Sequence, residues 1–275
     1  MADGDILIHS GDFSQRVKAN GLAEAASEFN EFLAPLPHAH KLLIAGNHEI
    51  AFNDLSKAAI QALLPHCIYL EDSSVRLLGL EFYGSPWTSS HRMGFSASHE
   101  ELAQHWAAIP ASTDVLITHL PPRCVLDLAY SESSPDVVCE LCAKRHPQYR
   151  HWGSPALFTE VTTRIKPLVH LFGHVHECNG VLLEHGVLFS NASMDLIPRP
   201  IVIDIYLPPQ QSPPSSPRSP SLSPRFISSA FAAITGGATS SAATVPTADT
   251  DISLSGSLTI SGSRTSSSPR CCSTA

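Results

Sequence analysis

Short apolar runs recur through the first 207 residues and are separated by polar loops. Several runs have the length and composition of buried β-strands: Ile6–Ile8, Lys41–Ala45, Asp114–Thr118, Leu168–Phe172, Gly186–Phe189 and Ile201–Tyr206. Alternating runs predict further strands at Val75–Tyr83 and Val181–Glu184. Apolar residues at helical spacing predict helices at Gly21–Leu33, His99–Ala108 and Pro155–Ile165. Because strands alternate with helices, the pattern predicts an α/β fold with a largely buried sheet.

The composition changes after Leu207, where Ser, Pro, Thr and Ala replace the large apolar residues. Such a segment cannot bury enough apolar surface to offset its ordering entropy. We therefore expect a domain at 1–207 and a disordered tail at 208–275, with a transient helix at the apolar patch Phe226–Ile234. Five Ser-Pro pairs in the tail are either sites for proline-directed kinases or products of its composition: Ser212, Ser216, Ser219, Ser223 and Ser268.

Charge and composition exclude several classes of protein. The formal net charge of −8 argues against a surface for nucleic-acid polymers, which would be basic. The chain has no apolar stretch long enough to span a membrane and no signal-peptide pattern at its start, so we expect a cytoplasmic protein. The 7 Cys are then expected to be thiols, while the 15 His raise the question of a metal site.

Polar residues of metal-ligand type follow four of the predicted strands. They are Gly11-Asp12, Gly46-Asn47-His48-Glu49, Thr118-His119 and Gly173-His174-Val175-His176. In α/β sheets reactive groups gather beyond the carboxyl ends of the strands. An Asp carboxylate can bridge two divalent ions, and neutral Asn and His complete the ligand shells without adding negative charge. Two such ions can attract and clamp a phosphate group, so the sequence indicates a phosphate-directed metal centre.

The order of these motifs resembles the calcineurin-like metallophosphoesterase superfamily. Ile44–Glu49, Gly84-Ser-Pro-Trp87 and Asp114–Pro122 are similar to its metallophosphoesterase domain-containing (MPPED) group. The resemblance covers about residues 4–207. It implies a four-layer α/β/β/α sandwich.

The resemblance also implies the roles of single residues. Asp12 matches the bridging carboxylate, while one metal has three further ligands: Asn47, His119 and His174. His176 matches a ligand of the other metal. His48 matches the residue that contacts the phosphate and helps to protonate the leaving oxygen, and Asn47 also lies against the substrate. Arg123 either meets a substrate phosphate or forms a surface salt bridge.

The activity that the resemblance implies is metal-dependent phosphohydrolysis in which a metal-bound hydroxide is the nucleophile. We expect Mn²⁺ as the ion, with Fe or Zn as alternatives. The expected substrate is a small phosphodiester, with cyclic nucleotides the leading class. A non-catalytic binding or scaffold protein on a degraded phosphoesterase domain is the alternative, and a protein phosphatase is a weaker third.

One motif of the superfamily is missing. Its first strand ends in Asp-x-His, which supplies two ligands to the metal that His176 binds, but nothing before Asp12 has this pattern. We therefore expect the first strand to be missing, an exposed edge or cavity beside Ile6–Ile8, and an incomplete second metal site. An incomplete gene model or an alternative start would fit, as would a single-metal or non-catalytic descendant, and we expect this chain to be weakly active or inactive.

A second group of candidate ligands lies between His119 and His174. Cys139-Glu-Leu-Cys142 is followed by His146 and His151, at spacings shorter than those of the usual zinc finger. Both an ordinary loop with free thiols and a small structural zinc site remain open.

Overall fold

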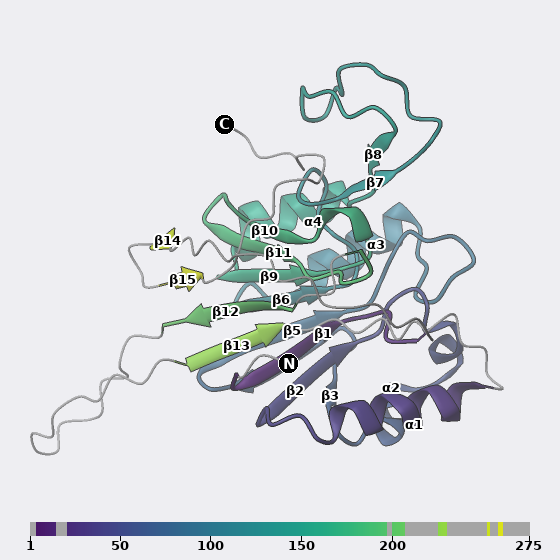
Figure 1. Ribbon diagram of the computed structural model, residues 1–275, viewed down its shortest axis with the longest axis vertical. Helices are drawn as coiled ribbons and strands as arrows, with labels where there is room; N and C mark the ends of the chain where they lie inside the picture. The colour runs from purple at the N-terminus through teal and green to yellow at the C-terminus, as the bar shows by residue number, and fades with distance from the viewer. Residues whose placement is uncertain are drawn as a thin grey trace, which may run out of the picture.

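Two β-sheets lie face to face at the centre of the protein (Figure 1). The computed structural model describes residues 4–14, 21–196 and 200–206, and the backbone of three further strands. The first sheet has the order β14 (Ile252–Ser253), β15 (Leu258–Ile260), β12 (Ile201–Ile205), β13 (Arg225–Ser229), β1 (Ile6–Ser10), β2 (His40–Ile44) and β3 (Ile68–Tyr69). The second has the order β10 (Gly180–Glu184), β11 (Val187–Asn191), β9 (Val169–Phe172), β6 (Val115–Thr118), β5 (Leu80–Ser85) and β4 (Ser73–Leu77).

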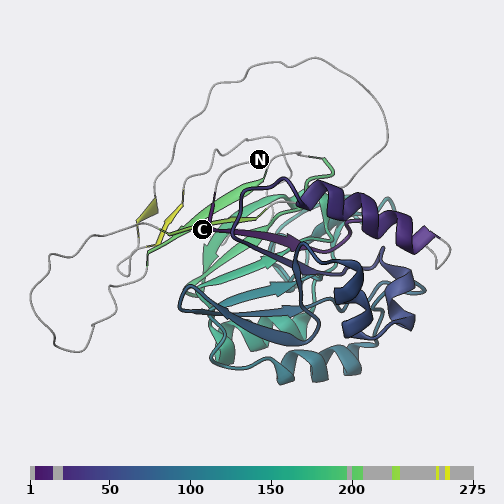
Figure 2. The same ribbon diagram turned by 90° about the horizontal axis from the view of Figure 1, so that it is seen from below.

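Helices cover the outer faces of both sheets (Figure 2). The first sheet is covered by α1 (Leu22–Leu33) and α2 (Lys57–Leu63). The second is covered by α3 (His99–Ala108) and α4 (Pro155–Thr159), which continues as the π-helix η3 (Glu160–Ile165). Short 3-10 helices occur at η2 (Ile50–Asp54) and η4 (His176–Cys178), and a small hairpin is formed by β7 (Leu128–Tyr130) and β8 (Tyr149–His151).

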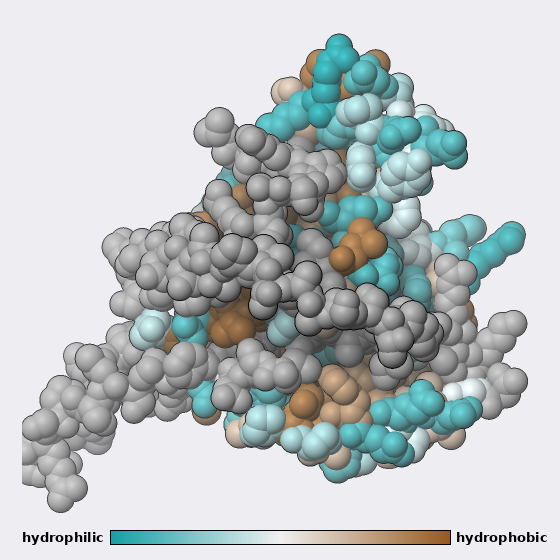
Figure 3. Space-filling view, viewed as in Figure 1, coloured by the Kyte–Doolittle hydropathy of each residue, from teal (hydrophilic) through white to brown (hydrophobic). Residues whose placement is uncertain are grey.

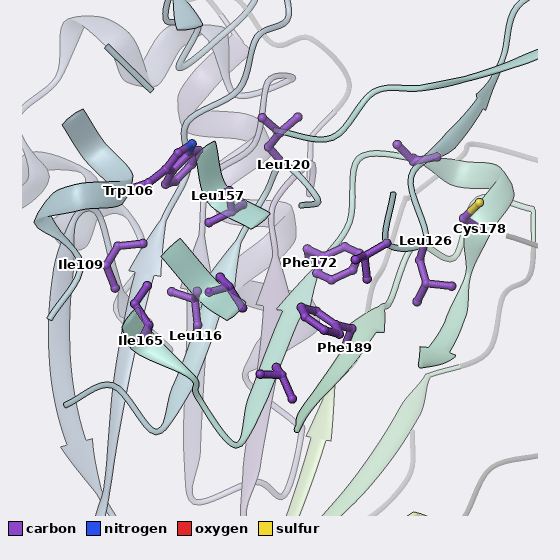
Figure 4. Close-up of a cluster of buried hydrophobic side chains, with 14 of the residues drawn as sticks. Trp106, Ile109, Leu116, Leu120, Leu126, Leu157, Ile165, Phe172, Cys178 and Phe189 are labelled. Carbon is purple, nitrogen blue, oxygen red and sulfur yellow. The ribbon is translucent and has the colours of Figure 1, made fainter. Parts of the chain in front are cut away.

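Three apolar clusters separate the four layers. Along β1, Ile6 and Ile8 face the second sheet, while Leu7 faces the other way and packs in the cluster with α1. This follows from the two-residue period of a strand. The cluster between the second sheet and its helices contains Trp106 and Phe172 and is shown in Figure 4. The predicted four-layer α/β/β/α sandwich is therefore confirmed.

Local sequence explains how α3 and α4 are placed. Ser98 accepts a hydrogen bond from the Glu101 N–H, and the Glu101 side chain accepts one from the Ser98 N–H. This capping box fixes the start of α3. Trp106 of α3 donates its indole N–H to Ser154, which is the N-cap of α4. The two helices are thus joined through a cap as well as through apolar packing.

Parallel pairing brings the predicted metal ligands to one end of the sandwich. β1 pairs with β2 in parallel, and Ser10 lies opposite Ile44. β6 pairs with β9 in parallel, and Ile117 lies opposite Leu171. The carboxyl ends of each pair therefore meet at one edge of their sheet, where the chain leaves for the loops that carry the candidate ligands.

The place next to β1 is filled. β13 lies between β1 and β12, with Ile227 paired in parallel to Ile6 and antiparallel to Ile203. The exposed edge expected beside β1 is therefore not found. Arg225–Ser229 is a strand, whereas a transient helix was expected from Phe226. The Ser-Pro pairs lie outside the described residues, and the domain boundary at residue 207 stays a prediction.

Candidate metal centre

Four side chains converge where β1, β2, β6 and β9 end. Asp12 Oδ2 lies 3.1 Å from His119 Nε2. Asn47 Oδ1 lies 3.0 Å from the same His119 nitrogen and 2.8 Å from His174 Nδ1. The structure therefore brings together the four residues that the sequence assigned to one metal, although they come from both sheets.

Hydrogen bonds from the backbone orient these ligands. Asp12 has a left-handed backbone with φ of 61°, and its Oδ1 accepts the His48 N–H at 2.8 Å, which leaves Oδ2 facing His119. His119 Nδ1 lies 2.7 Å from the carbonyl oxygen of Ser10 and donates to it, so Nε2 points into the centre. Such second contacts commonly fix the ring orientation of a metal-binding His.

Two glycines allow the strand ends to approach each other. A Cβ atom at Gly46 would lie 2.3 Å from Asp12 Oδ1 and 2.6 Å from His119 Cε1. A Cβ atom at Gly11 would lie 2.6 Å from His119 Nδ1, and Gly11 has φ of 97°. Any side chain at either position would displace a candidate ligand.

The pKa shifts at the centre favour an ionised Asp12, a protonated His119 and a neutral His174. Burial alone would raise the pKa of Asp12, but His119 and the contacts with His48 lower it below its usual value. Burial lowers the pKa of His119, but Asp12 outweighs burial and raises it overall. Burial and the neighbouring His119 lower the pKa of His174 to about 3. His174 is thus neutral, the form in which imidazole binds a metal.

Glu49 organises the loops around the centre, a role that the sequence did not reveal. Its carboxylate accepts the backbone N–H groups of Asp12, Ser14 and Gly46 at 2.7–2.9 Å, and the Ser14 hydroxyl at 2.8 Å. Glu49 is 2% exposed. Burial and the Asp12 charge raise the pKa of Glu49 to about 7, whereas the donated hydrogen bonds oppose that rise.

The loop that carries His174 is also held by a buried amide. Asn191 donates to the carbonyl oxygens of Val175 at 2.8 Å and Leu126 at 3.0 Å. His174 itself has φ of 68°, a conformation that needs such support in a residue other than glycine. Asn191 is therefore a positioning residue for the loop that carries His174.

The sequence predicted three further site residues: His176, Arg123 and His48. His176 pairs with Asp195 at 3.0 Å, and its side chain is 41% exposed. It lies outside the cluster of Asp12, His119 and His174. Arg123 donates from Nε to the Gly153 carbonyl oxygen at 3.0 Å. His48 reaches the centre through its backbone N–H.

The donor set fits a divalent transition metal. One ligand atom from each of Asp12, His119 and His174 lies within 4.8 Å of the others, and the Asn47 oxygen lies between the two imidazoles. Mixed carboxylate, amide and imidazole donors suit Mn, Fe or Zn. These four residues would hold the ion.

The fold and this centre define a metal-dependent phosphoesterase. The profile of the calcineurin-like phosphoesterase family matches residues 2–178, and the chain belongs to that family. It is 34% identical over 237 residues to human metallophosphoesterase domain-containing protein 1, covering 76% of this chain and 67% of that protein. It is 36% identical over 229 residues to a UPF0046 protein of Caenorhabditis elegans, covering 76% of this chain and 75% of the relative. No helix in the described part of the chain is long and apolar enough to cross a membrane.

Proposed function

We propose that the protein is a phosphodiesterase that hydrolyses small phosphodiesters, with cyclic nucleotides the expected class. The observation that carries the proposal is the convergence of Asp12, Asn47, His119 and His174, each within hydrogen-bonding distance of at least one of the others. Membership in the calcineurin-like phosphoesterase family supports the reaction class. We further propose that manganese is the activating ion, because the donors are oxygen and imidazole nitrogen.

The chain's own residues divide the work. Bound ions would supply positive charge that polarises the phosphoryl group and lowers the pKa of a bound water. Asp12 supplies the anionic ligand, while Asn47 and His174 add no negative charge that would repel a phosphate. Water adds to phosphorus and releases one proton to solvent, the bond from phosphorus to the leaving oxygen breaks, and His48 donates a proton to that oxygen.

An aromatic side chain next to the centre supports a substrate with a planar base. The Trp152 ring lies 5.8 Å from the His174 ring, and Trp152 is 38% exposed. The Arg150 guanidinium lies 5.6 Å from the Trp152 ring centre. An indole in this position can stack on a nucleobase. Arg123 contacts Gly153, the residue that follows Trp152. We propose that Arg123 meets the substrate phosphate.

The test is hydrolysis of a chromogenic phosphodiester by the full chain with added manganese. We expect activity that His48→Ala lowers by about 100-fold or more, the typical size of a general-acid effect. His99→Ala is the matched control, because His99 is exposed at the start of α3. Activity that survives in His48→Ala would contradict the proposed role of His48, and hydrolysis of phosphomonoesters alone would contradict the proposed substrate class.

The second candidate function is metal-dependent binding without turnover. Its support is the place of His176, which pairs with Asp195 at an exposed position outside the cluster. Within the described residues a single group of donors gathers at the strand ends. A chain that binds manganese through Asp12 and binds a cyclic nucleotide, but hydrolyses no phosphodiester, would establish this alternative.

A further inference from the structure

A long loop projects from the sandwich between β7 and β8 (Figure 1). It spans residues 131–148, and its apolar residues Val137, Val138 and Leu141 are all more than half exposed. Figure 3 shows mostly hydrophilic residues, with a few hydrophobic ones, at this end of the molecule. A loop of this length without an apolar core needs another source of order.

Four side chains gather at the base of this loop. Each offers one ligand atom, and these atoms all lie within 4.8 Å of one another: Cys139, Cys142, His146 and His151. In a tetrahedral zinc site, bonds of about 2.3 Å to sulfur and about 2.0 Å to nitrogen put the ligand atoms about 3.3 to 3.8 Å apart. We propose that these four residues bind a structural zinc ion.

The backbone around Cys139 and Cys142 forms a tight turn held by hydrogen bonds. Val138 and Arg145 form an antiparallel bridge, and the Cys139 N–H donates to the Lys144 carbonyl oxygen at 2.9 Å. The chain turns back at Ala143, which has φ of 55° and donates to the Cys139 carbonyl oxygen at 2.8 Å. This turn brings the Cys139 and Cys142 sulfur atoms within 4.8 Å of each other.

The two histidines are oriented by their other nitrogen. His146 Nδ1 lies 2.9 Å from the Tyr149 carbonyl oxygen, while its Nε2 is buried and has no hydrogen-bond partner. His151 Nδ1 lies 2.7 Å from Asp127 Oδ1, and both side chains are almost fully buried. A carboxylate behind a His is the usual second contact of a zinc ligand. The ring centres of His146 and His151 lie 5.0 Å apart and edge to face, as two imidazoles around one ion would.

The ligand types decide the ion and its role. Two thiols and two imidazoles form the donor set of tetrahedral zinc sites, and four protein ligands leave no position open for catalysis. Neither Cys139 nor Cys142 forms a disulfide in the structure, so no disulfide competes with the ion there. The site is separate from the centre at the strand ends, which uses other residues.

The zinc site would stabilise the segment Trp152–Gly153, which lies beside the phosphoesterase centre. The carboxylate of Asp127, which holds His151, also accepts the Gly153 N–H at 2.9 Å, and the Asp127 carbonyl oxygen accepts the Trp152 N–H at 3.0 Å. Trp152 in turn lies against His174. A Cβ atom at Gly153 would lie 2.4 Å from the Pro122 carbonyl oxygen, so the segment packs directly on the loop that follows His119. A zinc ion that orders this loop would therefore also fix the position of Trp152 beside His174.

The test is cobalt(II) substitution in the reduced full chain. Thiolate ligands give cobalt a charge-transfer absorption band in the near ultraviolet, which the oxygen and nitrogen donors at the strand ends cannot produce. We expect one equivalent of cobalt to produce this band and one equivalent of zinc to remove it. Cys142→Ser should abolish the band, while Cys124→Ser, the same change at a thiol outside the cluster, should keep it.

A proteolysis experiment on the unmodified chain covers the case in which Cys142→Ser does not fold. Lys144, Arg145 and Arg150 offer trypsin sites in the loop and at its end. We expect a chelator to accelerate cleavage there at least tenfold and added zinc to reverse the effect. A folded, reduced chain that gives no thiolate–cobalt band, or thiols that alkylating reagents reach only after reduction, would overturn the proposal.

Discussion

The carboxylate of Glu49 holds the backbone of Asp12: its Oε2 accepts the Asp12 N–H at 2.9 Å, across 37 residues of sequence. The same oxygen accepts the Gly46 N–H at 2.7 Å. One buried side chain thereby fixes the distance between the two loops of the first sheet that carry Asp12 and Asn47. Metal affinity should depend on Glu49 although it is not one of the four converging ligands.

Glu49→Gln tests this dependence. Gln keeps the size of the side chain but replaces one acceptor oxygen with a donor, so at least one of the backbone N–H groups loses its partner. We expect manganese affinity to fall by about 10–100-fold, the usual effect of losing a second contact to a metal site, and the free energy of unfolding to fall by about 1–3 kcal/mol. Calorimetric titration with manganese measures the first effect and urea unfolding measures the second. Glu28→Gln, at an exposed position of α1, should change neither.

Gly46→Ala should disrupt the centre sterically. The new Cβ would lie 2.3 Å from Asp12 Oδ1, so the carboxylate must move. We expect manganese binding in the same titration to weaken by more than tenfold. Gly186→Ala is the control, because a Cβ there meets nothing within 4 Å, although φ of 77° makes the change unfavourable. That variant should lose about 1–2 kcal/mol of stability and keep its metal affinity; equal losses of metal affinity in both variants would refute the steric account.

His170 should make the protein less stable in acid. Burial lowers the pKa of His170 from 6.5 to about 3, and His170 is fully buried. Its contribution to stability is complete above the unfolded pKa and is lost as pH falls toward the folded pKa, because only the unfolded chain takes up the proton there. One such proton lowers the free energy of unfolding by about 2 kcal/mol between about pH 7 and about pH 5. Urea unfolding of His170→Gln should lack this part of the pH dependence, and a variant with the same dependence as the original chain would exclude the assignment.

The strand β13 should stabilise the first sheet. It pairs with both β1 and β12, so a chain that ends at Tyr206 would expose the hydrogen-bonding edges of two strands. We expect that chain to lose at least about 2 kcal/mol, since each backbone hydrogen bond contributes about 1 kcal/mol. A chain that ends at Ile260 should lose less. Thermal unfolding compares the two, and equal stability of the chain ending at Tyr206 and the full chain would support a domain that ends at residue 207.

The sequence predicted most strands and helices of the sandwich, because these elements depend on the pattern of neighbouring residues. Leu42–Ala45 is buried as the sequence indicated, and α3 has the predicted bounds because a capping box defines its start. The strand at Val75–Tyr83 divides into β4 and β5 around a turn at Leu78 and Gly79, both with positive φ. Short elements such as α2 and β3 carry too few residues for a periodic signal and were not predicted.

Long-range relationships were beyond reach of the sequence. Gly11-Asp12 and Gly46–Glu49 were expected to share one site, but the four hydrogen bonds that Glu49 accepts depend on how β1 and β2 pair. His151 and Asp127 form their contact only because β7 and β8 form a hairpin. The pairing of β13 with β1 joins segments more than 200 residues apart, which no local pattern encodes.

The central claim is that Asp12, Asn47, His119 and His174 form a metal centre that hydrolyses phosphodiesters. Its most direct test measures bound manganese and the rate of phosphodiester hydrolysis in the same samples, for the full chain and for His119→Ala. We predict that the rate rises in proportion to bound manganese, and that His119→Ala, with Thr118→Ser as a folded neighbour control, loses both by at least about 100-fold. Manganese bound through His119 without any hydrolysis, or hydrolysis that is independent of manganese, would contradict the claim.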